Sequence, residues 1–396
     1  MRHYHRLRCG VIPWLPLVLA LTVGQVSVAQ NIKYGPFRMD LGFTLGADFR
    51  DNANASQNHP KADAQLTLGP TLSGGVFLPF AGGEEFTLTL AAIYSHSITG
   101  VQADTFGAPL TATLVLPIYV AQWNVVLSDS YNRQNDPLET TFAANRTQVL
   151  EDQNIASISA TRQLGKFSVT LAAQRIDQMY PQDPSQEQAD YQFSFTPAYF
   201  FREGYSVFIR NTYGINELDD PALRDSIGYS TELGLNGQIT KSLSGTISLG
   251  WSHSELEATK TNGVDHIDGV SSTVSLSYTH PLRPNTTHSL SFFHSPGITL
   301  QLKDSNITET TGVNYNIAHR LNRYMTISPS VTWTRLHSLS GSTETADLIV
   351  VGISLQRQFT KQLIGSLAYQ YQTRKSDVNG LSYDVNEVTV NFNYTF

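Results

Sequence analysis

The sequence predicts an all-β protein, a single closed antiparallel transmembrane β-barrel of about 18 strands, with 16 strands as the alternative. Three observations lead to this fold class. Apolar and polar residues alternate with a period of two along many segments, which is typical of strands with one oily and one wet face. The breaks between these segments are alternately short and long. The final segment ends the chain on an aromatic residue.

The first 29 residues have the composition of a secretory signal peptide. Three arginines precede an apolar stretch over 11–21, which is too short to span a bilayer. Ser27 and Ala29 place small residues before a cleavage site at Gln30. We therefore expect two parts, a signal peptide over 1–29 and a barrel over 30–396. The single cysteine, Cys9, would leave with the signal, so no disulfide is expected.

The composition excludes several other classes of protein. The chain has 396 residues with 26 Lys+Arg and 33 Asp+Glu, a formal net charge of −7, and only 15% of residues are charged. A soluble domain carries roughly 25% charged residues. A helical membrane protein would need apolar runs of about 20 residues, which are missing here. An acidic chain is also a poor nucleic-acid binder, so we expect no nucleic-acid partner.

The clearest strand pattern covers residues 37–50, FRMDLGFTLGADFR. Phe37 and every second residue after it are apolar, and the intervening positions are polar or glycine. The same alternation recurs in LIGSLAYQYQTR, TISLGWSHS and STVSLSYTH, and no window has an apolar stripe of helical period. We therefore predict no helix after residue 29.

The breaks between strands fall into two classes. Short turns are predicted at 80–85, 163–166, 202–204, 239–242, 281–285, 320–323 and 359–362. Long polar loops are predicted at 51–61, 132–153, 181–190, 216–225, 257–269 and 340–347. Outer-membrane barrels have short periplasmic turns and long external loops, and the asymmetry predicts the same arrangement here.

The last nine residues, VTVNFNYTF, place their apolar side chains on one face and Thr and Asn on the other. Phe392, Tyr394 and Phe396 are the aromatic residues of the apolar face. This pattern resembles the signal that outer-membrane barrels present to the barrel assembly machinery, which we expect as a partner. The alternative is a buried strand that ends a soluble domain.

Hydrocarbon requires every backbone polar group to have an internal partner, so a sheet with an apolar face must close on itself. Aromatic residues near strand ends fit interfacial girdles at Tyr94, Trp123, Tyr205, Trp251, Tyr278, Trp333 and Tyr369. Prolines conflict with the pattern, because proline removes a ladder donor. Either strand boundaries or bulges must explain Pro70, Pro117, Pro197, Pro296 and Pro329.

The opening strand LGFTLGADFR, which runs into Asp51 and Asn52, and the closing VTVNFNYTF together resemble the uncharacterised β-barrel porins of Gram-negative outer membranes. The resemblance implies an outer-membrane location, with lipid and lipopolysaccharide as surroundings, and a pore. Some barrels of this kind are linked to exopolysaccharide export. The resemblance supplies no catalytic residue, and a homo-oligomer is an open alternative by analogy with general porins.

No catalytic motif or phosphate-binding glycine loop occurs in the sequence, so we expect neither an enzyme nor a cofactor. A weak metal site could be formed by Asp265, His266 and Asp268, whose oxygen and nitrogen atoms suit a divalent ion. A solvated external loop is the favoured interpretation of this segment.

The inward rows are mostly Ser, Thr, Asn and Gln, which suits a passive pore for small hydrophilic solutes. Their charged members, with neither sign dominating, are Arg38, Asp40, Asp48, Arg210, Glu232 and Arg374. The alternatives are a barrel that exports a surface polysaccharide and a structural barrel with no transport.

The segment 132–153 is the longest predicted connection and carries Arg133, Asp136, Glu139 and Arg146. One hypothesis folds it into the barrel, where it narrows the pore. A mobile surface loop is the slightly favoured alternative.

Overall fold

The computed structural model describes residues 32–78, 84–102, 104–134, 150–181, 187–218, 225–256, 266–281, 283–299, 306–339 and 344–396. The predicted signal peptide lies outside these residues. In the described ranges the regular structure consists of strands, and no helix there has the length and hydropathy needed to cross a membrane.

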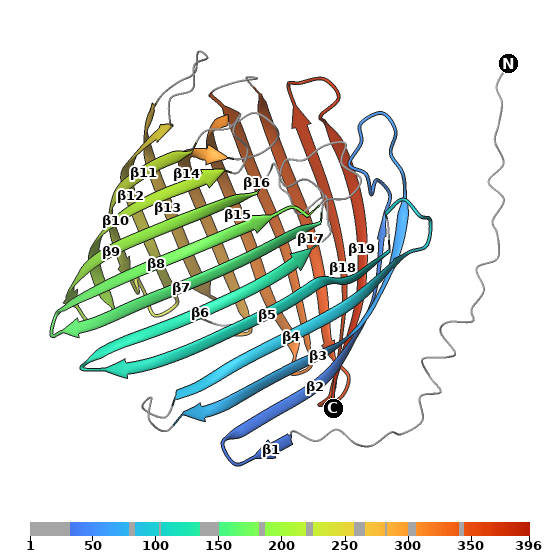
Figure 1. Ribbon diagram of the computed structural model, residues 1–396, viewed down its shortest axis with the longest axis horizontal. Helices are drawn as coiled ribbons and strands as arrows, with labels where there is room; N and C mark the ends of the chain where they lie inside the picture. The colour runs from blue at the N-terminus through green and yellow to red at the C-terminus, as the bar shows by residue number, and fades with distance from the viewer. Residues whose placement is uncertain are drawn as a thin grey trace.

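The prediction of a closed antiparallel barrel of 18 strands is confirmed (Figure 1). Each strand from β2 onward pairs antiparallel with the next, and β19 pairs with β2 to close the ring. The strands are β2 Phe37–Arg50, β3 Asp63–Leu78, β4 Glu84–Ser97, β5 Thr105–Val120, β6 Trp123–Gln134, β7 Glu151–Leu164, β8 Phe167–Met179, β9 Gln188–Arg202, β10 Tyr205–Leu218, β11 Ser226–Gly237, β12 Leu243–Leu256, β13 His266–Thr279, β14 Thr286–Thr299, β15 Asn306–Asn322, β16 Met325–Ser338, β17 Thr345–Gln358, β18 Leu363–Ser376 and β19 Tyr383–Thr395.

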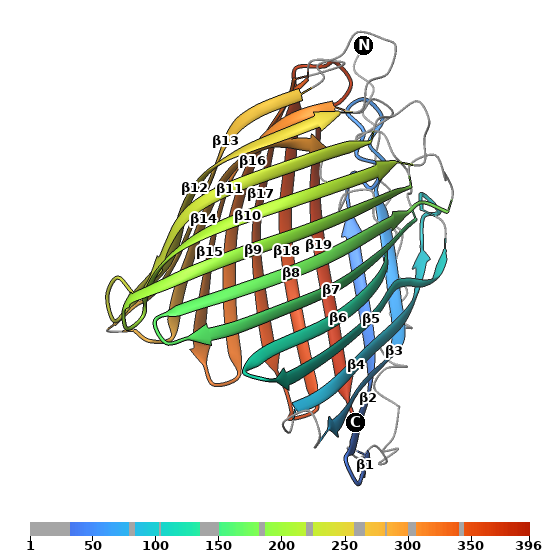
Figure 2. The ribbon, with the colours of Figure 1, turned by 60° about the vertical axis from the view of Figure 1, so that its left-hand side comes forward.

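A short additional strand, β1 Ile32–Tyr34, precedes the ring. It pairs with β2 from Phe37 to Met39, where β19 no longer reaches. The backbone N–H of Phe396 donates to Leu41 O at 2.9 Å, which is the last bond of the closing seam. Both views place β1 and the C-terminus at the same end of the barrel (Figures 1 and 2). β1 therefore covers the part of the β2 edge that the C-terminus leaves open.

The two ends of the barrel differ in their connections, as predicted. Tight turns join β5 to β6, β7 to β8, β9 to β10 and β15 to β16, and longer loops lie at the other end. The predicted loop over 132–153 was too long, because β6 continues to Gln134 and β7 begins at Glu151. The sequence also missed the connections 98–104, 300–305 and 377–382. Polar residues on a strand that extends beyond the lipid resemble a loop in sequence, which explains why the loop over 132–153 was predicted too long.

The strand register separates an apolar face from a polar face around the barrel. Leu249, on the apolar face of β12, is 62% exposed, as expected for a side chain that meets lipid. The register places all seven predicted girdle aromatics on this apolar face. The polar face is therefore the interior of the barrel, and its residues are called interior below.

The prolines are accommodated by local gaps in the hydrogen-bonded ladder. Pro197 pairs with Val169 on β8, whereas the described ladder to β10 skips it. Pro329 pairs with Ile353 on β17 and is skipped on the β15 side. The same one-sided pairing holds for Pro70, Pro117 and Pro296. A proline has no N–H to donate to the neighbouring strand on one side. Each of these prolines therefore lies where no pair with the strand on one side is described.

The turn between β5 and β6 holds an unusual backbone. Ala121 and Gln122 have φ values of 46° and 71°. Two-residue hairpins favour left-handed φ at both positions, but Asn-Gly is the preferred pair because other side chains are strained there. The neighbouring turn after β7 has positive φ only at its first position, which is Gly165 with φ of 63°, and glycine adopts this conformation without strain.

Candidate functional site

The register places all six predicted pore-lining residues on the interior face. Arg38 and Asp40 lie at the short-turn end of β2. Arg210 and Glu232 face each other on β10 and β11 near mid-barrel, with Nη1 and Oε2 3.6 Å apart. Glu232 also accepts a hydrogen bond from Ser248 Oγ at 3.2 Å, so this carboxylate is fixed between two neighbours.

Asp48 belongs to a charged cluster at the seam between β2 and β19. Arg50 Nε lies 2.9 Å from Asp48 Oδ2, and Arg50 Nη2 lies 3.2 Å from Glu387 Oε1. Thr389 Oγ1 donates to Asp48 Oδ1 at 3.1 Å. Two carboxylates thus share one guanidinium in this part of the interior.

Further interior acidic residues, which the sequence analysis did not single out, lie near the long-loop end. Ser97 Oγ and Thr99 Oγ1 donate to Asp63 at 2.8 and 2.6 Å, and Gln178 Nε2 donates to Glu151 at 3.1 Å. Asp190 accepts from the Asn216 amide. At the short-turn end, Arg320 joins Arg38 and Asp40 on the interior face. The interior is therefore more acidic at its long-loop end, although neither sign dominates over the whole wall.

Arg374 lies on the interior face of β18 but is 1% exposed. Its Nη2 lies 2.7 Å from Glu344 Oε1 in the loop before β17, and its Nη1 donates to Leu381 O in the loop before β19 at 2.5 Å. The guanidinium therefore ties two loops to the wall and is shielded from the open space of the barrel.

Apolar side chains replace polar ones on the interior face around Arg374. Leu336, Ala346 and Leu348 form one cluster, with Leu348 only 4% exposed, and Tyr383 and Val385 belong to another. These clusters are an apolar exception to the mostly polar inward rows that the sequence predicts. The run LIVVGI over 348–353 lacks alternation between apolar and polar residues. A strand that is apolar on both faces is expected to have both faces shielded from water.

Loop 51–62, between β2 and β3, covers part of this apolar interior patch. Ala55, at the centre of the loop, is 0% exposed and packs with Tyr383 and Val385. Asn52 Nδ2 donates to Asp384 O at 2.9 Å, and Gln57 Oε1 accepts from the Gly380 N–H at 2.9 Å. The loop is thus fixed against the inside of the wall by apolar contact and by hydrogen bonds.

The next loop, 98–104, is fixed beside it. Gln102 Nε2 donates to Ala53 O at 3.5 Å, and the Gln102 side chain also bonds with Gln65 on the interior face of β3. Asp104 accepts from the Ser97 N–H at 3.0 Å and lies 2.8 Å from His96 Nδ1. The hydrogen bond with His96 is the main cause that lowers the pKa of Asp104, so its carboxylate remains an acceptor for the loop.

The interior faces of β12, β13 and β14 form a different kind of wall, called the hydroxyl wall below. In the described part of these strands the interior side chains include no charged residue. Hydroxyl groups line it at Ser244, Thr246, Ser248, Ser252, Ser254, Ser271, Thr273, Ser275, Ser277, Thr287, Ser289, Ser291 and Ser295. In Figure 1 these strands lie on the far side of the barrel, behind the green β7–β9.

The predicted constriction residues are divided by the structure. Arg133 is part of β6, on the apolar face, and its Nε donates to Asp152 Oδ1 of β7 at 2.5 Å. It is therefore not a loop residue, and it points away from the interior. Asp136, Glu139 and Arg146 lie outside the described residues.

Of the weak metal candidates, His266 and Asp268 are on the apolar face of β13, and Asp265 lies outside the described residues. Asp268 Oδ1 lies 2.7 Å from His253 Nδ1, and Glu255 Oε1 lies 3.0 Å from His253 Nε2. Within the described ranges no group of three such side chains has the arrangement of a metal site.

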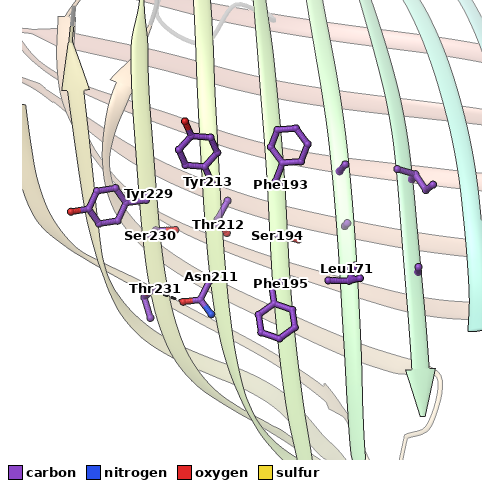
Figure 3. Close-up of a pocket in the computed structure, with 14 residues that line it drawn as sticks. Leu171, Phe193, Ser194, Phe195, Asn211, Thr212, Tyr213, Tyr229, Ser230 and Thr231 are labelled. Carbon is purple, nitrogen blue, oxygen red and sulfur yellow. Dashed lines mark hydrogen bonds between the residues drawn. The ribbon is translucent and has the colours of Figure 1, made fainter. Parts of the chain in front are cut away.

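A depression of about 750 Å³ is a groove on the outer surface over β7–β11. Figure 3 shows Phe193, Phe195, Tyr213 and Tyr229 on the near side of these strands, with the opposite wall of the barrel behind them. Because these rings share the apolar face, the groove faces lipid and is separate from the interior.

The three proposed assembly-signal residues, Phe392, Tyr394 and Phe396, also share the apolar face at the closing seam. The rings of Tyr394 and Phe396 meet edge to face with centroids 5.0 Å apart. The ring centroid of Phe392 lies 6.3 Å from that of Phe359. The last strand therefore presents a row of aromatic side chains toward lipid.

Several solved structures share this architecture at low sequence identity. OpdK from Pseudomonas aeruginosa is 11% identical, with a TM-score of 0.50 over 91% of this chain and 99% of that one. A BenF-like porin from Pseudomonas fluorescens Pf-5 is 11% identical, with a TM-score of 0.50 over 90% and 99%. OccK2 (OpdF) from P. aeruginosa, solved with glucuronate, is 11% identical with a TM-score of 0.50 over 90% and 98%. None of the curated proteins matches the chain.

The family model described as Putative beta-barrel porin 2 matches residues 120–396, from the end of β5 to the C-terminus. This match covers more than half of the chain and includes the interior residues of β6–β19. Together with the closed barrel, it places the protein in the outer membrane, surrounded by lipid. The chain belongs to the Putative beta-barrel porin 2 family and is an outer-membrane porin, a channel and not an enzyme.

Proposed function

We propose that the protein is a passive pore for small hydrophilic solutes, many of them uncharged. The observation that carries this proposal is the hydroxyl wall of β12–β14 inside a closed ring of 18 strands. Barrels of 16–18 strands leave an aqueous channel when loops do not fill it. Hydroxyl groups donate and accept hydrogen bonds without imposing a charge requirement on the solute.

The proposed path runs past three sets of charged residues. Asp48 contributes to the acidic outer part, the Arg210–Glu232 pair stands near the middle, and Arg38 and Asp40 stand at the periplasmic exit. Arg374 has a different proposed role, since its burial against Glu344 makes it an anchor for two external loops. Solutes pass that anchor without contacting it.

The proposed constriction involves two loops. Loop 51–62 narrows the outer mouth over β18 and β19, because Ala55 packs on the interior side of Tyr383 and Val385. The segment 135–150, which carries Asp136, Glu139 and Arg146, remains a second candidate from the sequence hypothesis. Deleting each loop separately distinguishes them.

The proposed partners follow from the two faces of the barrel. The aromatic row of β19 is the surface offered to the barrel assembly machinery during insertion. Charged pairs at the external ends of the apolar face, such as Arg335 with Asp347 at 2.9 Å, meet lipopolysaccharide head groups. Residues 1–29 act as the export signal, and residues 30–396 form the mature barrel.

The test is conductance of the purified protein in a planar lipid bilayer. We expect stepwise insertion of open channels in KCl. Proteoliposomes should also swell in iso-osmotic solutions of small neutral solutes and should not swell with solutes too large to enter. A barrel that inserts, shown by heat-dependent mobility on gels, but that neither conducts nor causes swelling would contradict the proposal.

A further inference from the structure

An aromatic side chain, Phe293 of β14, stands in the hydroxyl wall. It pairs with Thr273 on β13 and with Gly312 on β15. The adjacent Phe292 pairs with Val274 on the apolar face, so the alternation of a strand directs Phe293 to the interior. This position lies near the middle of β14, within the membrane-spanning part of the wall.

The ring of Phe293 lies against the wall. A Cβ atom built on Gly312 would overlap Cε1 and Cζ of the ring, so the ring covers this glycine. Phe293 is nevertheless 36% exposed. One side of the ring is therefore packed on β15, and the other side is open to the interior.

The surroundings of the open ring are small, polar and uncharged. Ser291 and Ser295 flank Phe293 along β14, and Ser271 and Thr273 stand beside it on β13. Ser271 is 7% exposed, and its Oγ has no hydrogen-bond partner among the described residues. Because Ser271 Oγ is buried, the hydroxyls open to a solute beside the ring are those of Thr273 and Ser295, which are exposed, and of Ser291, which is half-buried.

We propose that Phe293 and the adjacent hydroxyls form a weak binding site for neutral sugar rings on their way through the pore. A pyranose ring has an apolar face of C–H groups and a rim of hydroxyls. The apolar face suits an exposed aromatic ring, and the rim suits Ser and Thr side chains that both donate and accept. The absence of charge from the described interior of β12–β14 favours neutral sugars over sugar acids or amines.

The proposal rests on the proposed pore function and deepens it by naming a solute class. The alternative to a sugar site is a structural role for Phe293, in which the ring fills the space above Gly312 and stabilises the pairing of β14 with β15. If the role of the Phe293 ring is structural, its removal should affect folding of the barrel. If the ring binds sugar, its removal should shorten the time that a sugar molecule stays in the pore.

The experiment records single-channel currents of the full-length mature barrel in KCl while maltotriose is added to one side. We expect brief, concentration-dependent interruptions of the current by the sugar. Phe293→Ala should raise the apparent dissociation constant about tenfold. Phe293→Trp should retain or strengthen the block, because a larger ring offers the same face. Phe292→Ala, one residue away on the lipid side, is the matched control and should leave the block unchanged.

The outcomes separate the two proposals. An open channel that shows no maltotriose block, or the same block in wild type and Phe293→Ala, overturns the sugar site and leaves the pore intact. A barrel that inserts but never conducts overturns the pore and the site together. A third outcome is that Phe293→Ala loses heat-resistant folded protein to the same extent as it loses the maltotriose block, and that Phe293→Trp restores neither. This result would assign the ring a structural role and also overturn the sugar site.

Discussion

Arg50 and Glu387 join the first and last strands of the ring, β2 and β19, with Nη2 of the arginine 3.2 Å from Oε1 of the glutamate. Arg50 ends β2, and Glu387 lies opposite it on β19, so the pair bridges the seam at which the sheet closes. Asp48 lies 2.9 Å from the same guanidinium. One cation thus holds two carboxylates on the interior wall near the external mouth.

Replacing Arg50 with glutamine should change both the stability and the ion selectivity of the pore. Loss of a charged hydrogen-bonding group at the seam should lower the free energy of unfolding by about 1–3 kcal/mol. Removal of the positive charge leaves Asp48 and Glu387 uncompensated, so the pore should prefer cations more strongly. The reversal potential in a KCl gradient measures the second effect, and urea titration in detergent measures the first.

Arg175→Gln is the matched control for that experiment. Arg175 is also paired with a carboxylate, Asp177 at 2.7 Å, but it lies on the outer face of β8. The same change of charge at this position should leave the reversal potential unchanged. A shift of equal size in both variants would contradict an interior position for the seam cluster.

Removing residues 53–60 and joining the ends with a Gly-Ser linker should raise single-channel conductance. The deletion takes away Ala55 and exposes the interior side of Tyr383 and Val385, so the outer mouth becomes wider. The comparison is a deletion of 136–148, which tests the constriction hypothesis based on the sequence. Unchanged conductance after the first deletion would remove loop 51–62 from the constriction, and unchanged conductance after the second would remove 135–150.

Local alternation was sufficient to predict the barrel and most of its faces. In β2, and in β19 from Glu387 onward, each apolar residue faces lipid and each polar residue faces the interior, so these segments could be assigned from their sequence alone. The prolines suggested either wrong strand boundaries or bulges, because a sequence does not reveal which side of a strand is paired. The structure places each one in a gap of one ladder or beyond its last described pair, which only the positions of two neighbouring strands determine.

The parts of the site that were missed depend on what covers a residue. Leu348 interrupts the polar interior because it packs in an apolar cluster with Leu336 and Ala346, and alternation alone does not reveal that an inward apolar side chain will be covered. Phe293 follows Phe292 directly, so the pattern left open which ring faces inward. Arg133 was read as part of a loop because polar residues continue a strand beyond the lipid just as they begin a loop.

Replacing Ala121 with Asn and Gln122 with Gly should stabilise the barrel by about 1–2 kcal/mol. Both residues have positive φ in a two-residue hairpin, and Asn-Gly adopts this conformation with little strain. Urea titration in detergent, read from gel mobility of unheated samples, measures the change. Gly165→Ala in the neighbouring turn is the reverse experiment and should destabilise, since its φ is 63°. Effects of the same sign in both turns would contradict this account.

Replacing Phe396 with serine should lower the amount of protein in the outer membrane several-fold. The proposed reason is recognition, because the aromatic row of β19 is the surface offered to the assembly machinery. The alternative is stability, because the Phe396 N–H bonds to Leu41 O and its ring packs on Tyr394. Serine keeps the backbone bond, so refolding of the purified variant into detergent should match wild type. Reduced yield in cells with normal refolding in vitro supports recognition, whereas equal losses in both would assign Phe396 to the stability of the seam.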